Sequence, residues 1–152
     1  MQNLFEFSKQ NNVKYFMISF TDLFGGQRAK LVPAAAISEM QNNGAGFAGF
    51  ATWLDMTPAH PDMLAIPDPT SVVQLPWKPE VAWVAANCVM EDQLVEQAPR
   101  NVLQKQIDSA SKMGLRIKTG VEAEFFLLNS DGSQISDDLD TAIKPCYDQQ
   151  AI

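Results

Sequence analysis

Basic side chains are scarce in this sequence of 152 residues, and no run of them occurs. Eleven Lys and Arg residues stand against 18 Asp and Glu residues, which gives a net charge of −7 at pH 7. Proteins that hold a phosphate backbone rely on clustered Lys and Arg side chains. The composition therefore argues against a nucleic-acid partner.

Cysteines and long apolar runs are also scarce. Cys88 and Cys146 stand far apart and match no metal or redox spacing, so free thiols in a reducing compartment are the simplest interpretation. No apolar run approaches the ~20 residues that cross a bilayer, and the N-terminus lacks the basic and apolar regions of a secretory signal. We expect a soluble, cytoplasmic protein with no membrane partner.

The residues that are present indicate a globular fold. Hydrophobic residues make up 46% of the chain and charged residues 19%, which is an ordinary balance for a folded domain. Hydrophobic periodicity predicts an α+β fold with a small mixed sheet of about four strands and a domain boundary near 91–98. The expected helices cover 3–10, 33–43 and 99–114, and the expected strands cover 13–22, 27–33, 70–77, 81–90 and 119–128.

Two connections carry distinct signals. Gly25 and Gly26 can both adopt positive φ, which suits a tight hairpin between the first two strands. Residues 44–69 contain four prolines and three glycines and predict one long ordered loop, a type of segment that is usually functional. His60 lies between prolines in this loop and is interpreted as a loop residue rather than a ligand or base. Asp131 and Gly132 predict a later hairpin turn.

The predicted strand 119–128 carries two glutamates, Glu122 and Glu124, on one face. On strand periodicity alone, a solvated polar face is the more frequent explanation of such a pair. The same face continues with Phe126 and Leu128, however, and apolar neighbours make a buried carboxylate costly unless a cation compensates. Two carboxylates without an interleaved Lys or Arg suit Mg²⁺ or Mn²⁺, and a two-metal site of this kind supports phosphoryl transfer.

The setting of these glutamates resembles a known family. The strand "GVEAEFFLL", with the helix that opens on "PR" before it, resembles the start of the catalytic domain of glutamine synthetases. The stretch "FTDLFGGQRAKLVP" is similar to the N-terminal β-grasp hairpin of that family, and "PDMLAIPDPTSVVQLPW" is similar to its segment after the long loop. The ending "KPCYDQQAI" is similar to the bacterial type III-like branch and to the γ-glutamylmethylamide synthetases. The resemblance implies a β-grasp domain over 11–98 and the truncated start of a glutamine synthetase catalytic domain over 99–152.

The resemblance also implies a function. The parent enzyme would be an ATP-dependent glutamate–ammonia ligase that acts through γ-glutamyl phosphate with two Mg²⁺ or Mn²⁺ ions. Glu124 would ligate the metal nearer glutamate and Glu122 the metal nearer the ATP phosphates. Subunits of the family form dodecamer-like rings in which the long loop of one subunit reaches the catalytic domain of the next. The remaining active-site residues would lie beyond residue 152, so we expect no catalytic residue within this chain and no synthetase activity from the chain alone.

The long loop departs from the family pattern at the amine site. The family's Phe-Asp-Gly-Ser-Ser stretch, whose aspartate helps to bind ammonium, corresponds here to residues 47–51, with Ala48 in place of the aspartate. An amine site is expected around Ala48, Phe50 and Ala51, and Asp55 is a candidate for the missing charge. Ligation of another amine such as methylamine is therefore an alternative to ammonia. A non-catalytic β-grasp module for assembly or binding is an alternative of another class.

Overall fold

The computed structural model describes residues 3–125 and 128–133 and divides the chain into two compact units, Met1–Ile117 and Lys118–Ile152. Helices and strands are mixed in the first unit, and among the described residues no helix is long and apolar enough to cross a bilayer. In chain order the elements are α1 (Leu4–Gln10), β1 (Tyr15–Thr21), β2 (Gln27–Pro33), η1 (Ala34–Ala36), α2 (Ile37–Asn43), β3 (Ala45–Phe47), η2 (Gly49–Ala51), β4 (Met63–Pro67), η3 (Pro69–Ser71), β5 (Val73–Gln74), β6 (Val81–Met90), β7 (Gln93–Leu94) and α3 (Pro99–Lys112).

The strands form one sheet around a central parallel pair. The sheet order is β2-β1-β6-β4-β3, and the short strands β5 and β7 also pair with β6. β1 and β6 run parallel, with Tyr15 opposite Val81 and Ser19 opposite Ala85, whereas every other pairing in the described part of the chain is antiparallel. The sheet therefore has seven strands rather than the four predicted, because short strands form inside segments that were expected to be loops.

One face of the sheet carries the hydrophobic core. Phe16 and Ile18 of β1 are fully buried, since alternate side chains of a strand share a face. The parallel register places Phe16 beside Ala82 and Ile18 beside Val84, both of which are also fully buried. The alternation along β1 and β6 thus directs one apolar row from each strand into the same layer.

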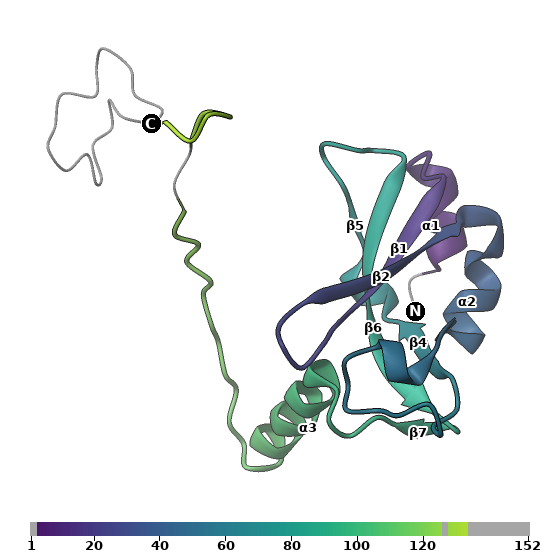
Figure 1. Ribbon diagram of the computed structural model, residues 1–152, viewed down its shortest axis with the longest axis vertical. Coiled ribbons are helices and arrows are strands. Elements are labelled where there is room, and N and C mark those ends of the chain that lie inside the picture. The colour runs from purple at the N-terminus through teal and green to yellow at the C-terminus, as the bar shows by residue number, and fades with distance from the viewer. Residues whose placement is uncertain (1–2, 126–127, 134–152) are drawn as a thin grey trace, which may run out of the picture. The chain divides into compact units, whose positions relative to one another are not determined.

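Helices α1 and α2 lie side by side against this core (Figure 1). Leu4 of α1 and Ile37 of α2 are fully buried in it. The backbone N–H of Leu4 donates a 2.9 Å hydrogen bond to the side chain of Gln41, which ties the two helices together. The side chain of Asn3 caps α1 by accepting hydrogen bonds from the first turn, as is typical of helix N-termini.

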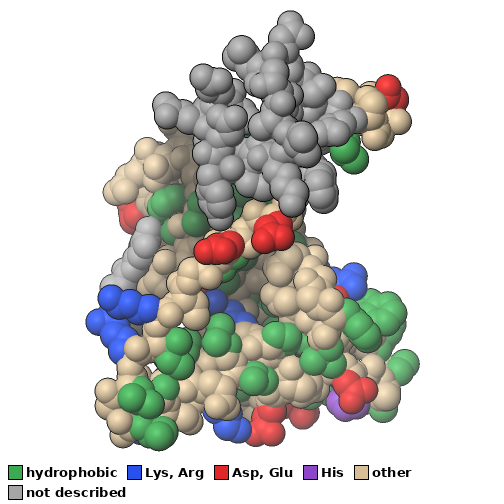
Figure 2. Space-filling view, turned by 90° about the vertical axis from the view of Figure 1, so that its left-hand side faces the viewer, with side chains coloured by type: hydrophobic (Ala, Val, Ile, Leu, Met, Phe, Trp, Pro, Cys, Tyr) green, Lys and Arg blue, Asp and Glu red, His purple; other side chains and the backbone are tan. Residues whose placement is uncertain are grey.

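The opposite face of the sheet is open over part of its area. Leu31, Met17, Trp83 and Val73 lie side by side in one row across β2, β1, β6 and β5. Leu31 is 54% exposed and Val73 is 53% exposed. On the side of the molecule drawn in Figure 2, hydrophobic side chains also reach the surface among charged ones. We call the row of Leu31, Met17, Trp83 and Val73 the open sheet face. Its apolar character is typical of a surface that another protein element covers.

Asp22, directly after β1, organises the turn between β1 and β2. Its buried carboxylate accepts hydrogen bonds from the N–H of Phe24 (2.9 Å), the N–H of Gly26 (2.8 Å) and Nε of Arg28 (2.7 Å). Desolvation by burial raises the pKa of Asp22, but these donors outweigh it and the pKa lies below its ordinary value. The predicted pair of positive-φ glycines is correct only for Gly25 (φ 82°). Gly26 is needed for close approach instead, because a Cβ there would lie 2.7 Å from the Asp22 carboxylate.

Residues 44–69 differ from the single long loop that was predicted. They contain β3 and β4, and β4 pairs with β6 through Ala65 opposite Cys88. Pro67, the last residue of β4, is buried at the strand end, where the missing N–H of a proline is tolerated. The prolines in this segment led to the prediction of a loop, although residues 63–67 form a short strand in which buried and half-buried side chains alternate. Conversely, the strand predicted over 70–77 is reduced to the two residues of β5.

The predicted strand 119–128 is wrong for its described residues up to 125. Residues 115–125 form neither helix nor strand, and all of them are exposed. A strand needs a neighbour for its backbone N–H and C=O groups, and no described strand pairs with these residues. The turn that follows is confirmed, since Gly132 has φ 83° and donates a 2.9 Å hydrogen bond to the C=O of Asn129.

Cys88 of β6 is expected not to react with a thiol-specific disulfide reagent in the folded chain. The side chain is a free thiol, 1% exposed, and burial raises its pKa to about 12, so only a very small fraction is the reactive thiolate at pH 8. Cys146 lies outside the described residues, and a Cys146→Ser variant isolates Cys88. We expect a chromogenic disulfide reagent at pH 8 to titrate no thiol in this variant until urea is added. Rapid titration of one thiol per chain without urea would contradict the burial of Cys88.

Candidate functional site

A pocket of about 420 Å³ opens between the β1–β2 turn and the segment that follows η2. We call it the loop pocket. Among the residues predicted for an amine site, Phe50 and Asp55 line this pocket, whereas Ala48 and Ala51 are exposed but do not line it. The complete lining is Leu23, Phe24, Phe50, Trp53, Asp55 and Met56.

Alternating burial directs the pocket side chains outward. Thr52 is 1% exposed and Leu54 is fully buried. The residues between and after them, Trp53 (φ 56°) and Asp55 (φ 58°), have left-handed backbone conformations. Such conformations are uncommon for residues other than glycine and are costly unless the surroundings hold them. The buried anchors thus hold a strained segment that presents an indole and a carboxylate to the surface.

Hydrogen bonds hold the segment in this shape. The hydroxyl of Thr52 donates to the C=O of Gly49 at 2.6 Å, and the side-chain amide of Gln97 donates to the C=O of Leu54 at 2.7 Å. Gly49 is buried, and a Cβ at this position would lie 2.8 Å from the backbone oxygen of Pro61. Local and long-range contacts therefore fix the same backbone path.

The β1–β2 turn supplies the second wall of the loop pocket. The rings of Phe24 and Trp53 meet edge to face, with centroids 5.6 Å apart. The guanidinium carbon of Arg28 lies 5.8 Å from the centroid of the Trp53 ring. The N–H of Leu23 donates a 3.2 Å hydrogen bond to the C=O of Trp53. The Asp22 carboxylate holds the shape of this turn and thereby fixes the position of the Phe24 ring in the pocket wall.

The lining of the loop pocket suits a small organic cation. Aromatic faces attract ammonium groups, and the carboxylate of Asp55 supplies the opposite charge at the same pocket. Sequence reasoning did not identify Leu23 and Phe24 as part of the site. The signal that could have found them is a pair of large apolar residues in a glycine turn, "DLFGG", where burial is not expected.

The two candidate metal ligands stand apart from the loop pocket in the chain. Glu122 and Glu124 are both exposed and lie in the segment without helix or strand. Their oxygen donors have the chemistry that Mg²⁺ and Mn²⁺ prefer. The described residues contain no group of three or more His, Cys, Asp or Glu side chains placed to hold a metal ion. The structure therefore does not place this pair on a strand face, and their metal roles stay predictions.

His60 is a loop residue, as predicted. It is exposed, and its Nδ1 accepts a 3.0 Å hydrogen bond from the backbone N–H of Thr57. The Thr57 hydroxyl lies 3.0 Å from the same nitrogen. These contacts close a local turn and leave His60 outside the lining of the loop pocket.

Comparisons with known proteins show which family this chain resembles. A family model described as the glutamine synthetase catalytic domain matches residues 96–150. A glutamine synthetase of Rhizobium leguminosarum bv. phaseoli is 69% identical over 150 residues, which cover 99% of this chain and 34% of the relative. A glutamate–methylamine ligase of Methyloversatilis universalis is 36% identical over 151 residues, which cover 97% of this chain and 34% of the relative.

Solved structures agree with this similarity. A GmaS/ADP complex is 55% identical and superimposes with a TM-score of 0.89. The match covers 99% of this chain and 35% of the chain in that structure. An apo GmaS structure is also 55% identical, with a TM-score of 0.88. The chain thus spans about a third of the length of the relatives it matches.

Proposed function

Because the chain belongs to the glutamine synthetase family, we propose that it forms the N-terminal part of an ATP-dependent glutamate–ammonia ligase that acts through γ-glutamyl phosphate. The single observation that carries this proposal is the 69% identity with a glutamine synthetase over 150 residues. That alignment extends over 99% of the chain, so it reaches both the sheet and the segment with Glu122 and Glu124. The 152-residue chain alone is expected to be inactive.

The proposed organisation is a β-grasp domain over 11–98 followed by the start of the catalytic domain over 99–152. The parallel pairing of β1 with β6, with a hairpin beside it, supports the first assignment. The family model that begins at residue 96 supports the second. The first compact unit extends to Ile117, so α3 would belong to the catalytic domain by descent and to the N-terminal unit by packing.

Glu122 and Glu124 are the proposed ligands for two Mg²⁺ or Mn²⁺ ions, with Glu124 nearer glutamate and Glu122 nearer the ATP phosphates. Their carboxylates fit these hard cations, but magnesium takes six oxygen ligands, so most ligands must come from other residues or water. The bound cations would neutralise phosphate oxygens during transfer. One solved relative is a GmaS/ADP complex, which accords with use of a nucleotide.

A ring-shaped homo-oligomer in the cytoplasm is part of the same proposal. The loop pocket exposes large hydrophobic side chains, since Phe50 is 57% exposed, Trp53 is 55% exposed and Phe24 is 78% exposed. Exposed apolar patches of this kind are typical of protein–protein contacts. A neighbouring subunit that covers the pocket would complete an amine site from two chains.

A larger amine such as methylamine is a second candidate substrate, favoured by the loop pocket itself. Ala48 occupies the position at which the family has its ammonium-binding aspartate. Asp55 lines the loop pocket together with Trp53 and Phe50. An aromatic lining with one carboxylate accommodates an alkylammonium ion through its methyl groups and its charge. A relative with 36% identity is a glutamate–methylamine ligase.

The assay that separates these functions measures phosphate release from ATP and glutamate by the enzyme that contains this chain. We expect release with ammonium, and a rise of about tenfold in the amine KM when Asp55→Asn removes one charge contact worth about 1.4 kcal/mol. Asp62→Asn, an exposed carboxylate outside the loop pocket, serves as the matched control and should leave the amine KM unchanged.

Three outcomes would revise the proposal. A strong preference for methylamine would replace ammonia as the substrate. Absence of phosphate release with every amine would favour the non-catalytic β-grasp module. Release by the purified 152-residue chain would contradict the expected division of the active site.

A further inference from the structure

The loop pocket has one charged group in its lining and a second one beside it. Among the described lining residues, Asp55 alone is charged. The guanidinium carbon of Arg28 lies 5.8 Å from the centroid of the Trp53 ring, and Trp53 belongs to that lining. A guanidinium keeps its positive charge at every ordinary pH, so at this position it repels a cation that enters the pocket. A pocket that takes an ammonium ion therefore needs a group that cancels the charge of Arg28.

Asp22 cancels this charge. The Asp22 side chain is fully buried, whereas the Arg28 side chain is 42% exposed. Oδ2 of Asp22 accepts a 2.7 Å hydrogen bond from Nε of Arg28. Desolvation raises the pKa of Asp22, but its hydrogen bonds outweigh this effect and lower the pKa below its ordinary value, so the carboxylate is charged at neutral pH. With the two opposite charges paired, the carboxylate of Asp55 sets the sign of the charge at the pocket.

The two oxygens of the Asp22 carboxylate have separate partners. Oδ1 accepts hydrogen bonds from the N–H of Phe24 (2.9 Å) and the N–H of Gly26 (2.8 Å), and these bonds shape the β1–β2 turn. Oδ2 faces Arg28. An asparagine side chain has one oxygen acceptor and one NH₂ donor, so Asp22→Asn keeps an acceptor for the turn and loses the partner of Arg28. This substitution separates the shape of the turn from the cancellation of charge.

Gly26 leaves room for the charge pair. Its φ is not positive, so the backbone conformation alone does not call for glycine. A Cβ at this position would lie 2.7 Å from Oδ2 of Asp22, the oxygen that pairs with Arg28. The absence of a side chain at residue 26 therefore serves the Asp22 carboxylate.

We propose that Asp22 is a positioning residue of the amine site, which holds the Phe24 wall with one oxygen and cancels the charge of Arg28 with the other, so that the loop pocket accepts an ammonium or alkylammonium ion. Asp22 does not line the pocket, and it acts through the turn and through Arg28. This inference rests on the proposed function, because it assigns a residue to the amine site of that ligase.

Amine kinetics of the enzyme that contains this chain test the proposal. Asp22→Asn leaves the charge of Arg28 uncompensated beside Trp53, and we expect the amine KM to rise about tenfold while kcat stays within about twofold. A second substitution, Arg28→Gln, removes the repelling charge. The double variant should therefore return to within about twofold of the wild-type amine KM.

This rescue distinguishes a role in charge from a role in structure alone. If Asp22 only shaped the turn, loss of the Arg28 charge would not restore the amine KM. Salt gives a second readout, because the Debye length falls from about 10 Å at about 0.1 M to about 3 Å at about 1 M ionic strength. The increase in KM caused by Asp22→Asn, relative to the wild type at the same salt, should shrink to about threefold or less at the higher value.

Gly26→Ala keeps the test decisive if Asp22→Asn does not fold. The added methyl group displaces Oδ2 of Asp22 from Arg28 and changes no charge. We expect the amine KM of this variant to rise about threefold, and Arg28→Gln should reverse that rise as well.

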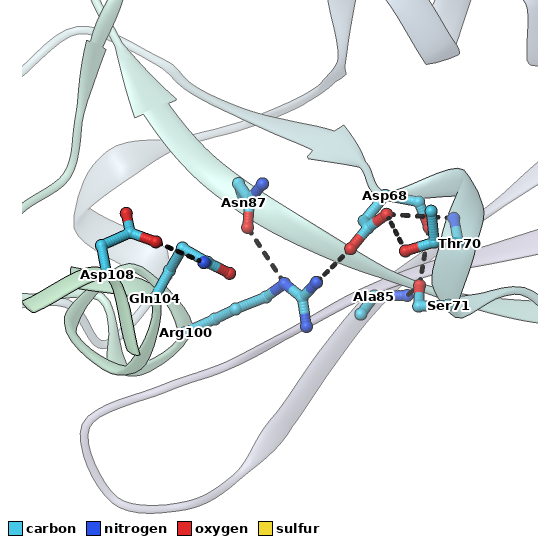
Figure 3. A network of polar contacts seen from close by, with 8 residues as sticks. All are labelled: Asp68, Thr70, Ser71, Ala85, Asn87, Arg100, Gln104 and Asp108. Carbon is cyan, nitrogen blue, oxygen red and sulfur yellow. Dashed lines mark hydrogen bonds and ion pairs between the residues drawn. The ribbon is translucent and has the colours of Figure 1, made fainter. Parts of the chain in front are cut away.

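Asp68→Asn is the matched control. The carboxylate of Asp68 forms an ion pair with the guanidinium of Arg100 and accepts hydrogen bonds from the N–H and the hydroxyl of Thr70 (Figure 3). The substitution thus removes another carboxylate that pairs with an arginine. Neither Asp68 nor Arg100 lines the loop pocket, so the amine KM should stay within about twofold. A rise equal to that of Asp22→Asn would overturn the specific role of Asp22.

Failure of this inference and failure of the proposed function look different. A wild-type amine KM in Asp22→Asn would overturn the inference. A raised KM that Arg28→Gln leaves in place would also overturn it, because Asp22 would then be a structural residue of the turn. Absence of phosphate release from the wild-type enzyme with every amine would overturn the proposed function itself.

Discussion

Phe16→Ala is expected to lower the free energy of unfolding by about 3–5 kcal/mol, the usual cost of removing a buried aromatic ring. Phe16 is 0% exposed and lies on the central strand β1. Its register neighbours, Val32 on β2 and Ala82 on β6, are buried as well. Neither neighbour can collapse far into the space that the ring leaves, because both belong to paired strands. Urea unfolding followed by circular dichroism measures the loss.

Phe24→Ala is the matched control for this change. Phe24 is 78% exposed in the β1–β2 turn, where its ring packs edge to face with the Trp53 ring. An exposed aromatic pair contributes about 1 kcal/mol or less, so the control should lose far less stability. Equal losses in the two variants would mean that β1 does not lie in the core.

Gly44→Ala is expected to cost about 2–3 kcal/mol, from a positive φ together with a steric clash. Gly44 has φ 79° at the end of α2, and its N–H donates a 2.8 Å hydrogen bond to the C=O of Met40. An added Cβ would lie 2.7 Å from Cδ1 of Ile66 and 3.2 Å from the backbone oxygen of Ala65. The side chain of Ile66 can move, but the backbone of β4 cannot move without breaking its pairing.

Gly46→Ala provides the comparison within the same chain segment. Gly46 lies in β3, and no atom would come within 4 Å of an added Cβ. Its substitution should change stability by about 0.5 kcal/mol or less, the range of ordinary surface changes. Thermal unfolding of the two variants at one protein concentration gives the comparison. A larger loss at Gly46 than at Gly44 would contradict the proposed end of α2.

The sequence predicted those elements whose signals are local. The helix expected over 99–114 is observed as α3, with Pro99 at its first position. The strand expected over 81–90 is observed as β6 with those bounds. Gly44 ends α2 as predicted. Helices often end on a residue with positive φ, and glycine adopts that conformation most easily, so a single residue gives the signal. Each of these features depends on a few neighbouring residues.

The sequence was less informative where pairing decides the structure. Strand β4 is hidden among prolines, and its existence depends on β6, which lies farther along the chain. The strand predicted over 119–128 had suitable alternation, but alternation describes side chains and cannot supply a partner for the backbone. Glu122 and Glu124 were therefore assigned a common face that the described structure does not contain.

The candidate site was predictable in part for the same reason. Phe50 and Asp55 share one segment, so their common location in the loop pocket follows from nearness in the chain. Phe24 meets Trp53 from the β1–β2 turn, whose shape is held by the Asp22 carboxylate and by the Leu23 N–H bond to the C=O of Trp53. That contact joins distant segments, and no local pattern announces it.

The parallel pairing of β1 with β6 has a consequence for the order of folding during synthesis. Tyr15 pairs with Val81, so the partner of the first strand leaves the ribosome several seconds after it, at about 5–20 residues per second. The hairpin of β1 and β2 can form at once, because its contacts are local. Its apolar face, with Phe16 and Ile18, then stays exposed to water until β6 has been synthesised and pairs with β1. The nascent chain should accordingly bind chaperones that recognise exposed hydrophobic segments until residue 90, the end of β6, has emerged. It should dissociate from them soon afterwards.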